Sequence, residues 1–440
     1  MDFIEEVKYW VEKAREADPQ CKVSGSGKHG YRFEKPISLA EVRTFEELHH
    51  LKLPENYVRV LTELGNGGAG PYYGLYSLYE IEFDESVQIG SDVTFLDASL
   101  TPEIWKQAVR ELWEAKDDEE YDELMRKIEA NAVWIGTEPG DYDTLLMCAG
   151  SENGKIISID LSMDEYDPPR FTHMTFEEWY LSYFQEVAAN HRIIRHGYTR
   201  LDTEEELIEA YEKAADMEPE ERKNERREIL SSLWRFQQLS ADTINRLRRN
   251  PDESIIDLLI RLIFMSDQEA GLAMFDEWFR GEHPEMAILM CRSIPDEIKE
   301  RYYQRALEIL YTPEISERLI PAIGVNGGEP CAKKLLYFLD DCKCKNAKDL
   351  IPYAKSDINP DDCRGTAVFV ICRCPDAAQY QTEIAELMHC SVYWVAFNAM
   401  QGAIRAELRE PVIIDALRWM KEYYKDDKYI PSNLRGVQGL

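Results

Sequence analysis

One glycine pattern in this sequence could bind phosphate groups. Residues 25–30, Gly-Ser-Gly-Lys-His-Gly, match the G-x-G-x-x-G pattern of dinucleotide sites. Such a site needs a strand before the pattern and a helix after it, so that pyrophosphate lies at the helix N-terminus. Here a helical segment precedes the pattern and Tyr31-Arg32-Phe33 follows it. A nucleotide site and a flexible connector are both compatible with these residues, and the flanks favour the connector.

Cysteine side chains could supply thiolates to a metal ion. The chain has ten cysteines, and two pairs, Cys342 with Cys344 and Cys372 with Cys374, have the Cys-x-Cys spacing that could present thiolates to zinc. On a helix, however, positions i and i+2 point in different directions. Small cysteines packed between helices are therefore the favoured alternative. The large chain and the lack of an export signal predict free thiols and a cytoplasmic location.

Carboxylates and histidines could act as catalytic or metal-binding groups. Asp160, Asp164, Glu165 and Asp167 gather after a predicted strand, but the spacing lacks the sixth-position glycine and twelfth-position glutamate of a calcium loop. A solvated acidic loop is favoured over a cation site. The eight histidines form no H-E-x-x-H motif, and the chain has no G-x-S-x-G or G-K-[ST] loop. The sequence therefore predicts neither an enzyme nor a cofactor or metal site.

The charge of the chain limits its partners. It has 83 Asp and Glu against 51 Lys and Arg, a net charge of −32, and residues 51–190 hold 29 acidic and 9 basic side chains. Such a field repels nucleic acid and anionic lipid and attracts basic partners. Acidity that only keeps the protein soluble is the alternative. Neither a signal peptide nor an apolar run of about 20 residues is present, so secretion and membrane spanning are not expected.

The first half of the chain alternates between helical and strand patterns. Apolar residues at helical spacing predict helices over residues 3–14, 38–52, 54–65 and 175–188 and two acidic helices within 101–130. Ser38 with Glu41, and Thr175 with Glu178, have capping-box spacing. In the first acidic helix the apolar stripe is expected to contain Ile104, Trp105, Val109, Leu112 and Trp113. Strands are predicted in 72–83, 132–137, 144–149 and 155–161, with turns at Gly140-Asp141 and Gly154.

These patterns predict two domains. Residues 1–195 should form an α+β domain in which helices flank a mixed sheet. Residues 196–440 show only helical stripes, restarted at Asn250-Pro251, Thr312-Pro313 and Asn359-Pro360, where a capping residue precedes a proline. An all-α array of stacked helical pairs, similar to HEAT repeats, is the expected fold of this second part.

A motif in the first domain resembles a known family. Leu53-Pro54-Glu55-Asn56-Tyr57, followed by Leu64-Gly65-Asn66-Gly67-Gly68, resembles the signature of the SMI1/KNR4 (SUKH) superfamily. Trp134-Ile135-Gly136 and Thr175-Phe176-x-x-Trp179 fit its later part. The resemblance covers residues 20–190 and does not explain the acidic insert at 101–130 or the helical second half. It implies a non-catalytic protein-binding domain, since many bacterial members resemble immunity proteins that neutralise toxin domains, often nucleases or deaminases.

The leading hypothesis is therefore a cytoplasmic immunity-type protein that sequesters a basic toxin domain. The alternative is a regulatory scaffold that binds a cellular protein through the helical array. Pro54, Gly65, Asn66, Gly67 and Gly68 are expected to be structural turn residues, with Gly65 as a left-handed helix cap. The partner-binding residues are expected to be Asp117, Asp118, Glu119, Glu120, Asp160, Asp164, Glu165, Asp167, Tyr72, Tyr73 and Tyr76. Sheet packing is the alternative for the three tyrosines.

Overall fold

The computed structural model describes residues 2–80, 94–160, 162–320, 328–435 and 437. The chain divides into two compact units, Met1–Leu239 and Ser240–Leu440. Within the described residues no helix combines the length and the apolar character that crossing a membrane requires.

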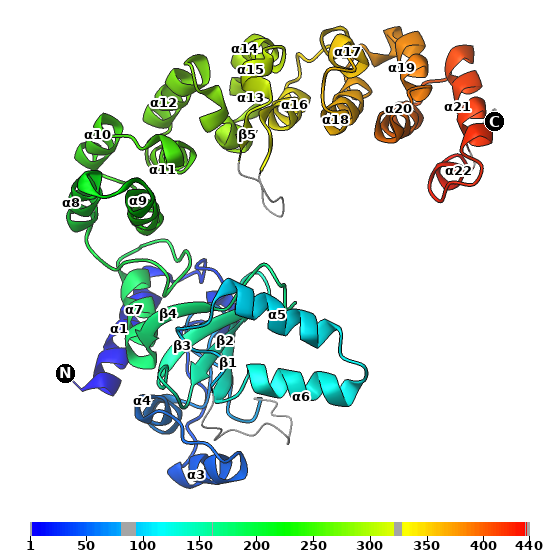
Figure 1. The fold of residues 1–440 in the computed structure, drawn as a ribbon. Helices are drawn as coiled ribbons and strands as arrows, with labels where there is room; N and C mark the ends of the chain where they lie inside the picture. The colour runs from blue at the N-terminus through cyan, green and yellow to red at the C-terminus, as the bar shows by residue number, and fades with distance from the viewer. Residues whose placement is uncertain (1, 81–93, 161, 321–327, 436, 438–440) are drawn as a thin grey trace. The chain divides into compact units, whose positions relative to one another are not determined.

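A four-stranded antiparallel sheet lies at the centre of the first unit (Figure 1). Its strands follow one another in chain order: β1 Ala132–Glu138, β2 Tyr142–Met147, β3 Lys155–Asp160 and β4 Arg170–Thr175. The expectation of a mixed sheet was wrong for these strands, because each joins the next through a short loop, and short loops can connect only antiparallel neighbours. The predicted turns are present: Gly140, Asp141 and Gly154 have φ angles of +90°, +63° and +81°.

The strand predictions failed at two places. No strand was expected at 170–175, where β4 pairs with β3 through an irregular register. Conversely, the tyrosine-rich stretch contributes only isolated bridges, from Phe33 to Gly68 and from Gly68 to Leu75, and residues 76–80 form no strand. Residues 81–83 of that predicted strand lie outside the described residues.

Each face of the sheet is covered by helices from a different part of the sequence (Figure 1). Val133, Ile135, Leu146 and Ile156 pack with α1 (Phe3–Ala17), α4 (Glu55–Arg59) and α7 (Phe176–Ala188). Leu145, Met147, Ile157 and Ile159 pack with α5 (Pro102–Trp113) and α6 (Asp118–Ile128). The alternation of strand residues between the two cores is the period of two expected for a sheet buried on both faces.

Local capping determines where several helices begin. Ser38 accepts from the Glu41 backbone N–H at the start of α3 (Leu39–Leu48), and Thr175 accepts from Glu178 at the start of α7. Both capping boxes were predicted. A short helix, α2 (Ser26–His29), follows Gly25 in the glycine pattern. After α4 the chain makes one π-helical turn, Val60–Leu64.

Gly65 does not form the left-handed cap that was predicted for it. Its φ is 177°, an extended conformation that any residue adopts. Glycine is required here for a different reason: a β-carbon would lie 2.4 Å from the Glu34 carbonyl oxygen. The close approach of the chain at Glu34, rather than the backbone angle, thus excludes a side chain.

The outer residues of α5 differ from the predicted stripe. Trp105, Val109 and Leu112 are buried as expected, but the side chains of Ile104 and Trp113 are 48 % and 63 % exposed. Fewer residues of α5 are buried than predicted, because the helix packs on the sheet along one side only. Trp113 is also the last residue of α5.

The first unit continues beyond the α+β fold. The helical pair α8 (Glu204–Lys213) and α9 (Pro219–Leu233) belongs to it, and the unit ends at Leu239. Arg235, just after α9, forms an ion pair with Glu186 of α7 at 2.9 Å, with only 3 % of its side chain exposed. The type of fold therefore changes near residue 190, whereas the compact unit extends about one helical pair further. Independent folding of residues 1–195 stays a prediction.

The second unit is mostly helical. Its helices of eight or more residues are α10 Ala241–Arg249, α11 Ile256–Ser266, α12 Gln268–Arg280, α14 Tyr303–Leu310, α16 Cys331–Asp341, α17 Ala347–Lys355, α18 Asp361–Ile371, α19 Gln381–Met388, α20 Tyr393–Arg405 and α21 Pro411–Tyr423. The short helices are α13 Asp296–Lys299, α15 Pro313–Ser316 and α22 Ile430–Asn433. Towards the C-terminus α16, α18 and α20 lie side by side, and α17, α19 and α21 form a second layer against them (Figure 1). This agrees with the predicted helical array.

Two details of the helical half differ from expectation. A minimal two-stranded ladder, β5 Leu319–Ile320 with β6 Glu329–Pro330, interrupts the helices, so this half is not strictly all-α. Of the three predicted cap-proline starts, only Thr312-Pro313 begins a helix at its proline. Asn250 instead ends α10, and Pro360 is itself the N-cap of α18.

Candidate protein-binding surface

The glycine turn after α4 is a structural part of the first unit. Gly67 and Gly68 have φ angles of +101° and +94°, and a β-carbon on Gly68 would lie 2.5 Å from the Arg32 carbonyl oxygen. The side chain of Asn66 is buried, and its Oδ1 accepts a hydrogen bond from the Leu78 N–H at 2.7 Å. Pro54 is the N-cap of α4. These residues shape the backbone, and their side chains offer little surface to a partner.

The turn is also fixed to the closing helix. Buried Tyr180 of α7 donates its hydroxyl hydrogen bond to the Ala69 carbonyl oxygen, directly after the two glycines. Its ring stacks on Phe176, which contacts Tyr57 of α4 edge to face. Buried aromatic rings therefore join the segment of α4 and the glycine turn to the closing helix α7. Ala69 and Tyr180, which share a hydrogen bond, are 111 residues apart in the sequence.

The three candidate tyrosines have different surroundings. Tyr72 is only 5 % exposed, and its hydroxyl accepts from the His196 N–H at 2.8 Å. Tyr76 is half-buried against the core, with the Lys28 ammonium 5.8 Å from its ring centroid. Tyr73 is 38 % exposed. Tyr72 therefore packs inside the domain, which is the alternative that the sequence left open. Of the three tyrosines, only Tyr73 has a ring that a partner could cover without rearrangement.

The second acidic cluster, at 160–167, is partly neutralised by its neighbours. Glu165 pairs with Arg110 at 2.5 Å, and Asp167 pairs with Arg170 at 3.0 Å. Asp160 and Asp164 accept backbone hydrogen bonds from Ser162 and Tyr166 within their own loop. Since ion pairs within one domain cancel much of the local field, this cluster is less negative than its sequence suggests.

The first acidic cluster, at 117–120, keeps more of its charge. Asp117 is the N-cap of α6 and accepts from the Glu120 N–H at 2.9 Å, while Glu120 pairs with Lys116. Asp118 and Glu119 are exposed in the first turn of α6. Acidic residues at this position also interact favourably with the helix dipole. Asp118 and Glu119 can therefore face a basic partner without breaking an internal contact.

Two exposed aromatic residues that were not among the predicted binding residues lie at the end of α5 and beside it. Trp113 donates to the Met163 carbonyl oxygen at 3.2 Å, and Tyr166 is 65 % exposed with the Lys106 ammonium 4.4 Å from its ring centroid. Trp105 holds the same loop by donating to the Asp164 carbonyl oxygen at 2.9 Å. We call the exposed side chains of this region the hairpin surface, defined as Trp113, Glu114, Asp117, Asp118, Glu119 and Tyr166.

A comparison with protein families agrees with the motif and the fold around it. Residues 36–182 match the model of the SMI1/KNR4 family (SUKH-1). The first half of the chain carries an SMI1/KNR4 domain. No curated protein and no solved structure matches the chain. SMI1/KNR4 domains of the immunity type are generally non-catalytic, and the family is consistent with immunity-type protein binding.

The bounds of the match, residues 36–182, enclose α5 and α6, the acidic helical segment that the family resemblance left unexplained. Their apolar side covers one face of the sheet. The two helices thus form a packed layer of the first unit, and they hold the hairpin surface on regular elements.

The carboxylates, cysteines and glycine pattern that could do chemistry have the following surroundings in the described residues. In the described parts of the chain, no three His, Cys, Asp or Glu side chains lie close enough to hold a metal ion. Burial raises the pKa of Cys372 and of Cys374 to about 12, so both thiols are protonated. In the glycine pattern, a β-carbon on Gly25 would lie 2.3 Å from the Tyr72 backbone, so this segment packs against the turn of the SMI1/KNR4 domain.

Proposed function

We propose that this protein is a cytoplasmic immunity-type binding protein whose SMI1/KNR4 domain sequesters a basic toxin domain, a nuclease or a deaminase. The observation that carries the proposal is the hairpin surface within the matched domain: exposed Trp113 ends α5, exposed Asp118 and Glu119 begin α6, and exposed Tyr166 contacts Lys106 of α5. A toxin that acts on nucleic acid needs a positive cleft for phosphates. An acidic protein surface that occupies the cleft competes with the substrate.

The two kinds of side chain on the hairpin surface would contribute differently. Exposed carboxylates mainly speed the encounter with a basic partner, and salt screens them with a Debye length of about 10 Å at 0.1 M. Exposed aromatic side chains give area that a partner can desolvate, and they slow dissociation. Trp113 has the larger apolar surface of the two, and its indole N–H already bonds within the domain. It can therefore bury its ring without losing a polar partner.

The first experiment identifies the partner and measures association. Tagged protein is purified from its host, bound proteins are identified by mass spectrometry, and the purified partner is used for stopped-flow association at low and high salt. The variant Asp118→Lys/Glu119→Lys leaves the Asp117 cap and the Glu120–Lys116 pair in place. We expect it to associate about tenfold more slowly than the wild type at low salt, with a smaller difference at high salt.

A matched control replaces two exposed acidic residues with lysine in the first turn of a different helix. Glu220→Lys/Glu221→Lys alters two exposed glutamates in the first turn of α9, outside the matched range. In both variants the two new lysines interact unfavourably with the positive end of the helix dipole. The association rate of the control variant should nevertheless stay close to that of the wild type. If both variants slow association equally, or neither does, the hairpin surface is not the binding site. The helical array would then be the surface to test.

A further inference from the structure

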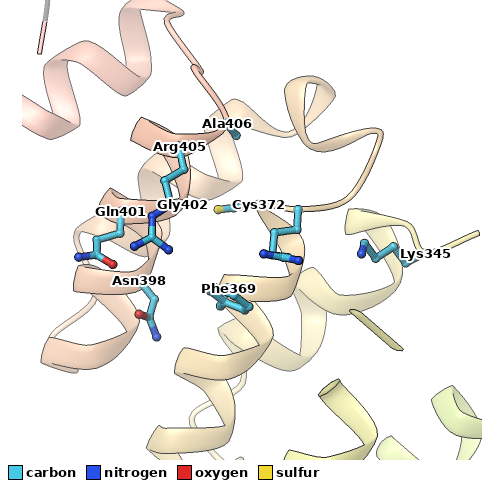
Figure 2. Close-up of a pocket in the computed structure, with 9 residues that line it drawn as sticks. Lys345, Phe369, Cys372, Asn398, Gln401, Gly402, Arg405 and Ala406 are labelled. Carbon is cyan, nitrogen blue, oxygen red and sulfur yellow. The ribbon is translucent and has the colours of Figure 1, made fainter. Parts of the chain in front are cut away.

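A pocket of about 400 Å³ lies in the second unit, between the C-terminal ends of α18 and α20 (Figure 2). Volumes of this size are typical of sites for small organic molecules. Its lining combines three cationic side chains, two amides, one aromatic ring and one buried thiol: Lys345, Arg373, Arg405, Asn398, Gln401, Phe369 and Cys372, together with Gly402 and Ala406.

Close packing of two helices builds the floor of the pocket. A β-carbon at Gly402 of α20 would lie 2.5 Å from the Cys372 sulfur, so only glycine lets α20 approach α18 so closely. This contact brings Arg373, one residue after Cys372, and Arg405, three residues after Gly402, into the lining of one pocket. Figure 2 shows the Arg405 side chain beside Gln401 and Asn398. Two arginines that are far apart in sequence thus line the same pocket.

The cations of the pocket are held in place but not fully neutralised. Asp340, at the end of α16, pairs with both Lys345 at 2.9 Å and Arg373 at 3.0 Å. One carboxylate therefore balances two cations. Arg405 is exposed and forms no ion pair with a carboxylate of the described residues. The pocket keeps an excess of positive charge.

The surrounding region does not share the acidity of the chain. Residues 331–405 hold nine Lys and Arg and nine Asp and Glu, in a chain with a net charge of −32. Where acidic residues are in excess, the negative field repels anions. In residues 331–405 acidic and basic residues are equal in number, so the three cations of the pocket can attract an anion. An anion could therefore approach this pocket.

The remaining lining residues favour an organic anion. The Arg373 guanidinium carbon lies 5.0 Å from the Phe369 ring centroid, and the half-buried ring forms an apolar wall. Asn398 and Gln401 are oriented by bonds to the Gly365 carbonyl oxygen at 2.9 Å and to Asn433 at 3.1 Å. Arginine pairs bind phosphate oxygens in a bidentate manner, and aromatic rings stack on planar groups. Cys372 is buried and protonated, so binding is non-covalent.

We propose that this pocket binds a small organic phosphate of mononucleotide size, with the phosphate between Arg373 and Arg405 and the planar part against Phe369. This site is separate from the hairpin surface and does not depend on the function proposed for it. The alternative role of the two arginines is to complement the carbonyl dipoles at the ends of α18 and α20. That role predicts a loss of stability on substitution without any ligand binding.

The test is isothermal titration calorimetry of the full-length protein with AMP and with inorganic phosphate at low salt. We expect one AMP per chain, weaker binding of phosphate alone, and binding that weakens as salt is raised. Arg405→Gln and Arg373→Gln should each weaken AMP binding about tenfold or more, because each removes a charged hydrogen-bond donor. Arg301→Gln, an exposed arginine of the same unit outside the pocket, should bind AMP like the wild type.

Thermal shift measurements complement the titration. AMP should raise the melting temperature of the wild type and of Arg301→Gln, and the same AMP concentration should raise that of Arg405→Gln clearly less. Three outcomes would overturn the proposal: no AMP binding by the wild type at millimolar concentration, equal AMP binding by all variants, or binding of a glutamate-rich peptide in place of AMP with the same dependence on both arginines. The last result would indicate a site for an acidic protein segment.

Discussion

Gly67 has a φ of +101°, and a β-carbon there would lie 2.8 Å from the Ser77 backbone nitrogen. Gly67→Val should therefore destabilise the protein by about 3 kcal/mol or more, since backbone strain and a steric overlap add. Circular dichroism melting would measure the effect. Gly27→Ala is the matched control, because Gly27 lacks a positive φ and a β-carbon there meets nothing closer than 3.9 Å. An unchanged melting temperature with lost partner binding would instead make the turn a contact site.

Glu138 is a buried carboxyl near the end of β1, and its Oε1 has no hydrogen-bond partner. Burial raises the pKa of Glu138 from 4.5 to about 7. Because folding raises this pKa, protonated Glu138 contributes to the free energy of unfolding. This contribution is fully present below pH 4.5 and is lost as the pH rises through about 7. Ionised Glu138 therefore destabilises the domain at pH 8.

The variant Glu138→Gln removes this ionisation. Relative to the wild type, we expect it to raise the melting temperature at pH 8, and we expect this advantage to be clearly smaller at pH 5.5. The comparison of two proteins at two pH values cancels contributions from other groups, such as buried His196, whose pKa burial lowers to about 4. A difference in melting temperature that is the same at both pH values would contradict the assignment.

At the scale of elements, Thr175 joins a strand to a helix. It is the last residue of β4 and the N-cap of α7, and it forms a capping box with Glu178. Thr175→Ala should lower the free energy of unfolding by about 1 kcal/mol, because a backbone donor of α7 loses its acceptor. Urea denaturation would measure this. Thr44→Ala is the control: this threonine lies inside α3 and bonds only to the Ala40 carbonyl oxygen. A similar loss in both variants would argue against a specific capping effect.

For the whole molecule, the end of the first unit has a measurable consequence. The ion pair between Arg235 and Glu186 and the bond from the Arg192 N–H to the Arg235 carbonyl oxygen connect α9 to the end of α7. A fragment of residues 1–239 should therefore melt at a temperature several degrees higher than a fragment of residues 1–195. Differential scanning calorimetry of both fragments would show this. Equal melting temperatures would place the functional domain boundary at 195, as the sequence predicts.

Local signals account for what the sequence could predict. Ser38 with Glu41 and Thr175 with Glu178 mark helix starts because a capping box involves residues only three apart. The turns at Gly140 and Gly154 follow from backbone angles that few residue types adopt. The glycine motif and the family resemblance led to the SMI1/KNR4 domain that the family comparison shows. The partner-binding residues rest on charge and on aromatic residue type, and they stay a prediction.

Tertiary structure decided the rest, because it depends on residues that are distant in sequence. The polar strand β4 has no apolar alternation and exists through its pairing with β3. Glu165 is neutralised by Arg110, 55 residues away, and Trp113 is exposed because α5 meets the sheet with only one side. The pocket gathers side chains from Lys345 to Ala406 across a contact made possible by Gly402. Residue types and short spacings thus determined the elements of this protein, whereas long-range packing decided which charges, rings and cavities face the solvent.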